Sequence, residues 1–237
     1  GVDYGFNMLD PIKGTVLTPG LSVGGEFDAS GIPAAIVSKY LAEHGIVVEK
    51  TGLYSFFIMF TIGITKGRWN TLVTELQQFK DAYDANAPLW RVMPGFAQAC
   101  PAYEETGLRD LCQRLHDFYK ANDVARLTTE MYTSYMEPAM RPTDAYAKLA
   151  HAEIDRIPFD ELEGRISAVL LTPYPPGIPL LVPGERVNRK IVEYLRFAKA
   201  FTQAFPGFEN DVHGLVKETG EDGEVVFKLD CVREDSH

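Results

Sequence analysis

The feature that most restricts the fold of this chain is the stretch from residue 66 to 86, where apolar residues recur at the spacing of one helical face. The residues of this apolar stripe are Trp69, Leu72, Val73, Leu76, Phe79 and Tyr83. A helix with one apolar face is stable when that face is buried against a partner, so neighbouring segments must supply an apolar surface. We therefore expect a long amphipathic helix packed within a globular lobe.

The segments before this helix provide such a surface. Residues 31–45 predict a helix, in which Pro33 suits the first helical position and Gly45 suits the left-handed residue that ends it. Residues 46–49 and 54–62 are rich in β-branched and aromatic side chains and predict strands. Helix, two strands and helix in this order predict a lobe of the α+β class.

The remainder of the chain predicts further helices and strands beyond a boundary. Residues 87–103 carry three prolines and indicate that boundary. Four helices are expected: one from a capping Thr106 to about residue 122, one that starts at Asp123, one that starts at Pro142, and one over 188–205. A buried strand is expected over 166–171 and a hairpin over 212–232. The whole chain is thus predicted to be α+β.

A proline-rich run from Thr172 to Pro179 can be neither a helix nor an interior strand, because four of its eight residues lack a backbone N–H. The run must form a stiff loop, and its one aromatic side chain is Tyr174. Rigid loops often build the wall of a binding pocket. An equally good interpretation is a rigid connection between two sheets.

Composition excludes several classes of function. Lys and Arg number 23 and Asp and Glu number 33, which gives a net charge of −10 and argues against a nucleic-acid surface. The richest apolar run, residues 53–64, is too short to span a membrane. The five histidines show no pairing at i, i+4, so a metal site has no support. Three widely spaced cysteines favour a reducing, cytoplasmic setting.

Glu49 is the most informative charged residue, because it ends an apolar run and precedes the turn at Gly52. A carboxylate in this position can bind a cationic substrate through a partly desolvated ion pair. Its side chain can instead form a structural salt bridge near Lys50 or simply be solvated, and from composition alone this non-functional interpretation is favoured.

Several segments, taken together, resemble the C-terminal part of the prokaryotic ornithine/lysine/arginine decarboxylases. The matching stretches are DPIK at 10–13, LTPG at 17–20, residues 31–52 with HGIVVEKTG, residues 173–185 with PYPPGIP, and FPGFE at 205–209 with His213–Gly214. They follow the family's order over nearly the whole chain. The family consists of large enzymes that use pyridoxal 5'-phosphate (PLP) and have an aspartate-aminotransferase-like fold.

The resemblance implies a division of the chain and a missing catalytic core. Residues 1–86 correspond to the later part of the small aminotransferase-like domain, and residues 87–237 correspond to the family's C-terminal domain. The family's Schiff-base lysine lies in a Ser-x-His-Lys motif, and this sequence contains no His-Lys pair. We therefore expect a fragment with no catalytic residue of its own, with PLP bound mainly by an upstream domain.

The resemblance also implies an activity. Similar proteins decarboxylate a basic L-amino acid and release CO₂ and a polyamine-type amine. The sequences of residues 65–69 and 108–112 favour arginine or lysine over ornithine as the substrate. In family terms Glu49 suits the distal cation of the substrate, and Tyr174 is a second substrate-binding candidate. The alternative is a non-catalytic binding or assembly module of the same fold.

Regulation and assembly are implied as well. Similar enzymes form homodimers that assemble into decamers, so a homo-oligomer is expected. The acid-induced lysine decarboxylases of enteric bacteria use an arginine at the end of the long helix to bind the alarmone guanosine tetraphosphate. This sequence has Asp81 at that place, and a carboxylate repels phosphates, so alarmone binding is not expected.

Overall fold

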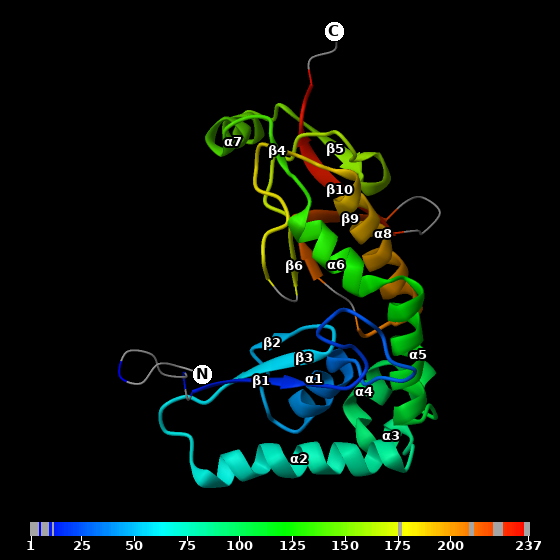
Figure 1. The fold of residues 1–237 in the computed structure, drawn as a ribbon. Helices are drawn as coiled ribbons and strands as arrows, with labels where there is room; N and C mark the ends of the chain where they lie inside the picture. The colour runs from blue at the N-terminus through cyan, green and yellow to red at the C-terminus, as the bar shows by residue number, and fades with distance from the viewer. Residues whose placement is uncertain are drawn as a thin grey trace. The chain divides into compact units, whose positions relative to one another are not determined.

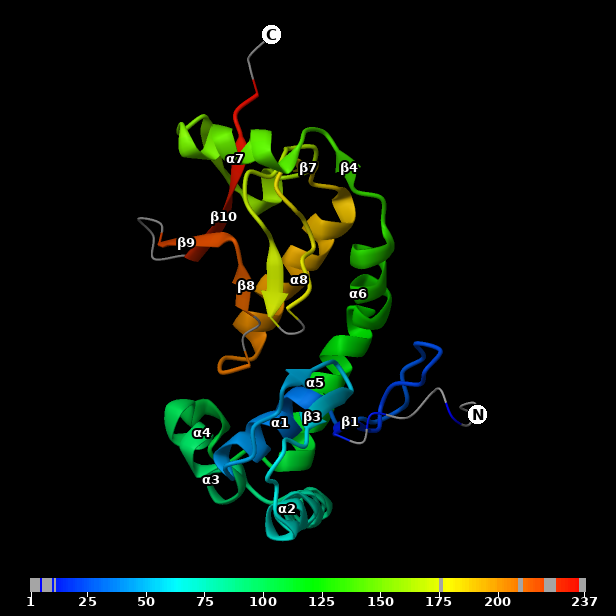
Figure 2. The same cartoon turned by 90° about the vertical axis from the view of Figure 1, so that its left-hand side faces the viewer.

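The computed structural model describes residue 5, residue 10 and residues 12–174, 177–208, 211–219 and 225–234. The chain forms two compact units, Gly1–Ala121 and Asn122–His237, and each is treated by itself (Figures 1 and 2). Both units combine helices with antiparallel strands, so the predicted α+β class is confirmed. The domain division at residue 86 stays a prediction, because a compact unit need not coincide with a homologous domain.

The first unit is built on a three-stranded antiparallel sheet. Strands β1 (Lys13–Leu17), β2 (Lys50–Thr51) and β3 (Ser55–Met59) lie in the order β1-β3-β2. Helix α1 (Ala34–Glu43) contacts β2 and β3. The buried side chains of this layer are Ile36, Val37 and Leu41 from the helix, and Phe56 and Ile58 from β3.

Helix α1 follows the prediction closely, but the segment after it does not. Pro33 is the N-cap residue, and Gly45 has a φ of +75°, as expected for a residue that ends a helix. The strand expected over 46–49 is wrong, since only Lys50–Thr51 joins the sheet. The physical reason is that the N–H of Ile46 donates to the carbonyl of Leu41 at 2.9 Å, which ties this segment to the helix end.

Helix α2 (Lys66–Asp84) confirms the predicted long helix, with Thr65 as its N-cap. Only Leu72 and Phe79 are buried, and Phe79 packs edge-on against Tyr40 of α1 at 5.2 Å between ring centroids. Trp69 and Val73 are about half exposed. The apolar stripe expected from the sequence is therefore only partly buried in this chain.

The proline-containing segment 87–103 is not a bare boundary, because its prolines sit at helix starts. It forms α3 (Leu89–Val92), α4 (Pro94–Ala99) and a 3₁₀ turn η1 (Pro101–Tyr103). Proline suits these positions, where its missing N–H has no intrahelical partner to lose. Helix α5 (Leu108–Ala121) ends the first unit.

The cap of α5 differs from the prediction. Instead of Thr106, Asn86 receives the free N–H groups, and its Oδ1 accepts from Arg109 at 3.0 Å and Asp110 at 3.2 Å. Asn86 has a φ of +48°. A Cβ at Gly107 would lie 2.2 Å from Asn86 Oδ1, so this long-range cap requires glycine there.

The second unit contains three longer helices, and all three were predicted. They are α6 (Val124–Thr133), α7 (Pro142–Ala150) and α8 (Arg189–Ala204). The side chain of Asn188 caps α8 by accepting from the N–H of Ile191 at 3.1 Å. Proline opens α7 at its first turn.

The strands of the second unit form one three-stranded sheet and two strand pairs. Strands β5 (Ile154–Pro158), β9 (Leu215–Thr219) and β10 (Val225–Val232) lie in the order β5-β10-β9, with the 3₁₀ turn η2 (Phe159–Glu161) after β5. The two pairs are β4 (Glu137–Pro138) with β7 (Glu185–Arg186), and β6 (Thr172–Tyr174) with β8 (Asp211–His213). The predicted hairpin is confirmed as β9–β10, and residues 220–224 between the two strands lie outside the described residues.

The buried strand expected over 166–171 is wrong. Only isolated bridges occur there, at Ile166, Ser167 and Leu171. The Ser167 side chain competes with a strand ladder, because its Oγ donates to the carbonyl of Val169 at 2.7 Å and accepts from the same residue's N–H. Four of the six residues are buried nonetheless (Ile166, Ser167, Ala168 and Leu171), and Ile166 packs in a small core with α7 and β10.

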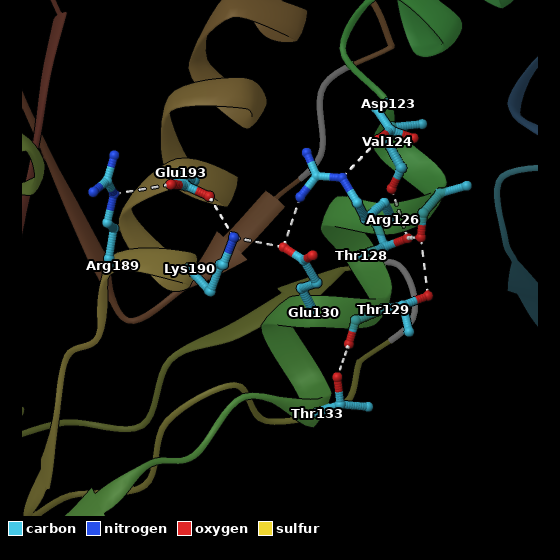
Figure 3. Close-up of polar contacts among 11 residues, drawn as sticks. Asp123, Val124, Arg126, Thr128, Thr129, Glu130, Thr133, Arg189, Lys190 and Glu193 are labelled. Carbon is cyan, nitrogen blue, oxygen red and sulfur yellow. Dashed lines mark hydrogen bonds and ion pairs between the residues drawn. The ribbon is translucent and has the colours of Figure 1, made fainter.

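Helices α6 and α8 are joined by a network of ion pairs (Figure 3). Glu130 on α6 lies at its centre, 2.8 Å from Arg126 and 2.6 Å from Lys190 of α8. Glu193 adds a second acceptor for Lys190 at 3.3 Å. Lys190, followed by Arg126, holds the pKa of Glu130 below its ordinary value.

Candidate functional site

Glu49 stands on a fixed backbone with a free side chain. Its N–H donates to the carbonyl of Phe57 at 2.9 Å, next to the ladder pair of Lys50 with Phe57. The side chain is exposed, and it makes no hydrogen bond or ion pair with any residue that the structure describes. The structural salt bridge considered from the sequence therefore has no partner within this part of the chain.

The backbone around Glu49 is held from both sides. The Thr51 hydroxyl donates to Ser38 Oγ of α1 at 2.8 Å, and the N–H of Gly52 donates to the carbonyl of Ser55 at 2.7 Å to close the turn. A Cβ at Gly52 would lie 2.8 Å from Ser55 Oγ. Glu49 thus projects from a rigid frame, which lowers the entropy cost of binding a cation there.

A hollow of about 510 Å³ with a mixed polar and apolar lining lies beside this frame. Its lining includes Ile46, Val47, Ile58, Phe60 and Trp69, while Glu49 is not part of the lining. The only charged or titratable side chains among its lining residues are those of His44 and Arg68. The hollow can hold an apolar group, and it offers no carboxylate.

Tyr174, the second candidate, lies in the other unit on the strand pair β6–β8. It is 54% exposed, and its ring meets the ring of His213 edge-on, with 5.1 Å between centroids. The ladder places it opposite Asp211. The prolines that follow it, at 175 and 176, lie outside the described residues.

A buried tyrosine–histidine pair was not predicted. His116 is fully buried; its Nε2 lies 3.1 Å from the carbonyl of Asp28 and its Nδ1 lies 2.7 Å from the Tyr54 hydroxyl. A carbonyl only accepts, so Nε2 carries the proton and Nδ1 accepts from Tyr54. Burial raises the pKa of the Tyr54 hydroxyl, which keeps it protonated as a donor.

The same region contains Cys112, which does not form a catalytic dyad with His116. Both side chains are fully buried, and both ring nitrogens of His116 are already engaged. Burial raises the pKa of the Cys112 thiol, which opposes formation of a nucleophilic thiolate. Cys112 is therefore a residue of the packed core.

A second hollow of about 380 Å³ includes Asp81. Tyr40, His44 and Arg91 also line it. The carboxylate of Asp81 accepts a hydrogen bond from Gln77 at 2.9 Å. The alarmone question is not answered by this geometry and stays a prediction.

The described residues do not form a binding site for PLP, the cofactor that the resemblance implies. A covalent aldehyde cofactor needs a lysine in a cavity of adequate size. The hollows of about 380 and 510 Å³ are lined by no lysine, and a slot lined by Lys199 and Lys217 encloses only about 30 Å³, room for one or two waters. No step through the cofactor is derived from this chain.

The described ranges contain no group of three or more His, Cys, Asp or Glu side chains arranged to hold a metal ion. None of their helices combines the length and apolar character needed to cross a bilayer.

Comparison with known proteins identifies the family. The family model described as Orn/Lys/Arg decarboxylase, C-terminal domain, matches residues 125–233, and the model described as Orn/Lys/Arg decarboxylase, major domain, matches residues 1–68. Together the two models of this one family account for most of the chain.

Individual relatives agree. Lysine decarboxylase LdcA of Pseudomonas aeruginosa is 54% identical over 231 residues, which are 96% of this chain and 31% of the relative. Biodegradative arginine decarboxylase of Escherichia coli is 38% identical over 213 residues, 88% of this chain and 28% of the relative. The solved structure of lysine decarboxylase A from Pseudomonas aeruginosa superposes with a TM-score of 0.88 at 54% identity, covering 95% of this chain and 30% of that one.

These matches also fix what the chain represents. It spans about a third of the length of the curated relatives that it matches. The similarity is continuous across both compact units, since 231 aligned residues extend beyond either one. The chain therefore belongs to the Orn/Lys/Arg decarboxylase family.

Proposed function

We propose that the longer protein to which this chain belongs is a PLP-dependent decarboxylase of L-lysine. The observation that carries this proposal is the 54% identity to a lysine decarboxylase over 96% of the chain. The sequence favoured arginine and lysine together over ornithine, and the relative at 54% identity favours lysine; lysine and arginine decarboxylases of Escherichia coli are equally similar to the chain, at 38%. In the reaction, the bond between the α-carbon and the carboxylate breaks, CO₂ leaves, and a proton takes its place to give pentane-1,5-diamine.

In this proposal the chain supplies substrate contacts and assembly surfaces, and the cofactor is bound upstream. Residues 1–86 form the later part of the small aminotransferase-like domain, and residues 87–237 form the family's C-terminal domain. The match of the major-domain model to residues 1–68 supports this arrangement. The absence of a lysine from the two larger hollows also supports it.

Glu49 is proposed to bind the distal ammonium group of lysine. Its carboxylate is exposed, unpaired within the described residues and carried by a backbone that β2 and β3 hold in place. A charge-assisted hydrogen bond to an ammonium group is stronger than one between neutral groups. Tyr174 is proposed as a further substrate contact, on the strength of its exposed ring in a strand pair.

Three further proposals concern the whole protein. A cytoplasmic location accords with three free cysteines, two of them buried. Assembly into homodimers and then a decamer follows from the family. Weak or absent binding of guanosine tetraphosphate follows from the negative charge of Asp81.

The experiment that tests the function is a substrate panel. The purified full-length protein, loaded with PLP, is assayed for CO₂ release from L-lysine, L-arginine and L-ornithine. We expect the highest kcat/KM for lysine, with pentane-1,5-diamine as the product. A higher kcat/KM for arginine would contradict the substrate assignment, and no release from any of the three would favour a non-catalytic binding or assembly module.

A further inference from the structure

We propose that Tyr174, Asp211 and His213 form a second recognition site, specific for the alkyl-ammonium group of the basic substrate or its diamine product. This inference rests on the proposed function for its choice of ligand. Two stretches that the sequence analysis singled out separately, the proline-rich run and the segment with His213–Gly214, are brought together here by the pairing of β6 with β8.

The strand register places the three side chains on one face. Tyr174 lies opposite Asp211, and Thr172 lies opposite His213; directly opposed residues of an antiparallel pair share a face, as do residues two apart on one strand. His213 Nε2 lies 3.3 Å from Asp211 Oδ2, and the Tyr174 and His213 ring centroids are 5.1 Å apart. The imidazole thus contacts both the carboxylate and the ring.

Two glycines hold this arrangement in place. Gly177 has a φ of +77°, its N–H donates to the carbonyl of Pro173, and a Cβ there would lie 2.6 Å from Tyr174 Cζ. Gly214 has a φ of +100°, and its Cβ would lie 2.2 Å from the carbonyl oxygen of Leu170. A side chain at either position would displace the ring or the strand, so the site is preorganised by its backbone.

The chemistry of the three groups fits an ammonium ion. The Asp211 carboxylate supplies charge, and the Tyr174 ring supplies a π-face that attracts a cation near its centroid. The two side chains remain 65% and 54% exposed, so a ligand has access to both. His213 is a positioning residue, because its ring nitrogen contacts the carboxylate and orients it.

Competing cations lie on the opposite face of β8. Val212, between Asp211 and His213, points away from them and lines the slot that contains Lys199 and Lys217. On the near face, the hydroxyl of Thr172 is buried and has no hydrogen-bond partner among the described residues. The near face therefore presents one carboxylate, one aromatic ring and the imidazole of His213, while the Thr172 hydroxyl is buried.

The test is a binding titration that requires no turnover. The chain is labelled with ¹⁵N at histidine, the His213 signal is identified by its loss in His213→Gln, and pentane-1,5-diamine is added at constant pH and ionic strength. We expect a saturable shift of the His213 signal. Pentane-1,5-diol, which has the same length and no charge, is expected to produce none.

Variants separate the two binding groups. Asp211→Asn and Tyr174→Ala are each expected to weaken diamine binding by about two- to fivefold, the range for exposed ion pairs and cation–π contacts. Tyr174→Phe keeps the π-face and should bind as the unchanged chain does. Asp144→Asn, at an exposed carboxylate on α7, is the matched control and should also bind normally.

The outcome distinguishes this inference from the proposed function. Absence of a saturable shift, or a shift that Asp211→Asn leaves unchanged, overturns the site even if the full-length protein decarboxylates lysine. A shift that depends on Asp211 and Tyr174 supports the site. Failure of the proposed function would appear separately, as a full-length protein that binds diamine here and releases no CO₂ from lysine.

Discussion

The replacement Tyr54→Phe removes one oxygen atom from the core of the first unit and tests the tyrosine–histidine pair directly. The phenylalanine ring keeps the edge-on contacts with Phe27 and Tyr119, whose centroids lie 6.1 and 6.2 Å away. What is lost is the 2.7 Å hydrogen bond to His116 Nδ1. Because His116 is fully buried, no solvent molecule replaces the missing donor.

The size of the effect follows from this geometry. A buried acceptor left without a partner costs about 1–3 kcal/mol. With a urea dependence of about 1–3 kcal/mol per M, the unfolding midpoint of the first unit should fall by roughly 1 M. The ring contacts are unchanged, so the loss belongs to the hydrogen bond and not to a cavity.

The assay uses the chain's own probes. Both tryptophans, Trp69 and Trp90, lie in the first unit, so their fluorescence in a urea titration reports the unfolding of that unit. Tyr83→Phe is the matched control, because Tyr83 is half-buried and its hydroxyl has no partner among the described residues. The control should change stability by less than about 0.5 kcal/mol. If Tyr54→Phe shifts the midpoint no more than Tyr83→Phe does, the pair contributes nothing and our reasoning is wrong.

Three other outcomes follow from the same structure. Gly31→Ala should destabilise the first unit by about 1–3 kcal/mol in the same urea titration, because the new Cβ would lie 2.3 Å from His116 Nδ1. Gly24→Ala is the control and should be tolerated, because its Cβ would meet only Ser22 Oγ, at 3.6 Å. Folding lowers the pKa of Glu130 below its ordinary value of 4.5. The ionised Glu130 therefore stabilises the fold when the pH is above 4.5, and this stabilisation is lost as the pH falls through the pKa of the folded state. The difference in melting temperature between the unchanged chain and Glu130→Gln should therefore shrink below about pH 4.5. Burial raises the pKa of the Cys112 thiol, and it raises the pKa of the Cys231 thiol to about 12. A disulfide reagent should therefore label the native chain mainly at Cys100. The variant Cys100→Ala should lose most of this fast reaction.

Local signals explain the parts of the fold that the sequence predicts well. Helix α2 begins after a capping Thr65, α8 after a capping Asn188, and α7 at Pro142, and each of these signals acts within a few residues. Gly45 likewise ends α1 through its own backbone conformation. No knowledge of distant segments is needed at any of these positions.

The expectations from sequence are wrong where a polar group can form a hydrogen bond to more than one partner. Residues 46–49 have the composition of a strand, yet the N–H of Ile46 bonds to the end of α1. The hydroxyl of Ser167 bonds to the carbonyl of Val169, while its backbone N–H bonds to Glu185, so the segment forms only isolated bridges. The cap of α5 comes from Asn86, some twenty residues upstream, so a local search finds Thr106 instead.

For the candidate site, too, local features can be predicted from the sequence and contacts between distant residues cannot. The position of Glu49 beside a glycine turn is readable from the sequence, and the structure places it immediately before β2 as an exposed carboxylate. The partners of Tyr54 and Tyr174 are not readable, because His116 and Asp211 lie far along the chain and neither pattern nor spacing links them. Only the pairing of β6 with β8 and the packing of α5 reveal these contacts.

The most direct measurement of the central claim is the effect of Glu49→Gln on two substrates with the same carbon chain. Full-length enzyme and the variant are assayed for kcat/KM with L-lysine and with L-norleucine, which lacks the distal ammonium group. Glu26→Gln, at another exposed carboxylate of the first unit, is the control. If Glu49 binds the distal cation, kcat/KM for lysine falls by roughly ten- to a hundredfold, the equivalent of a charged hydrogen bond, while norleucine and the control are unaffected. An unchanged kcat/KM for lysine, or an equal loss for norleucine, would contradict the account.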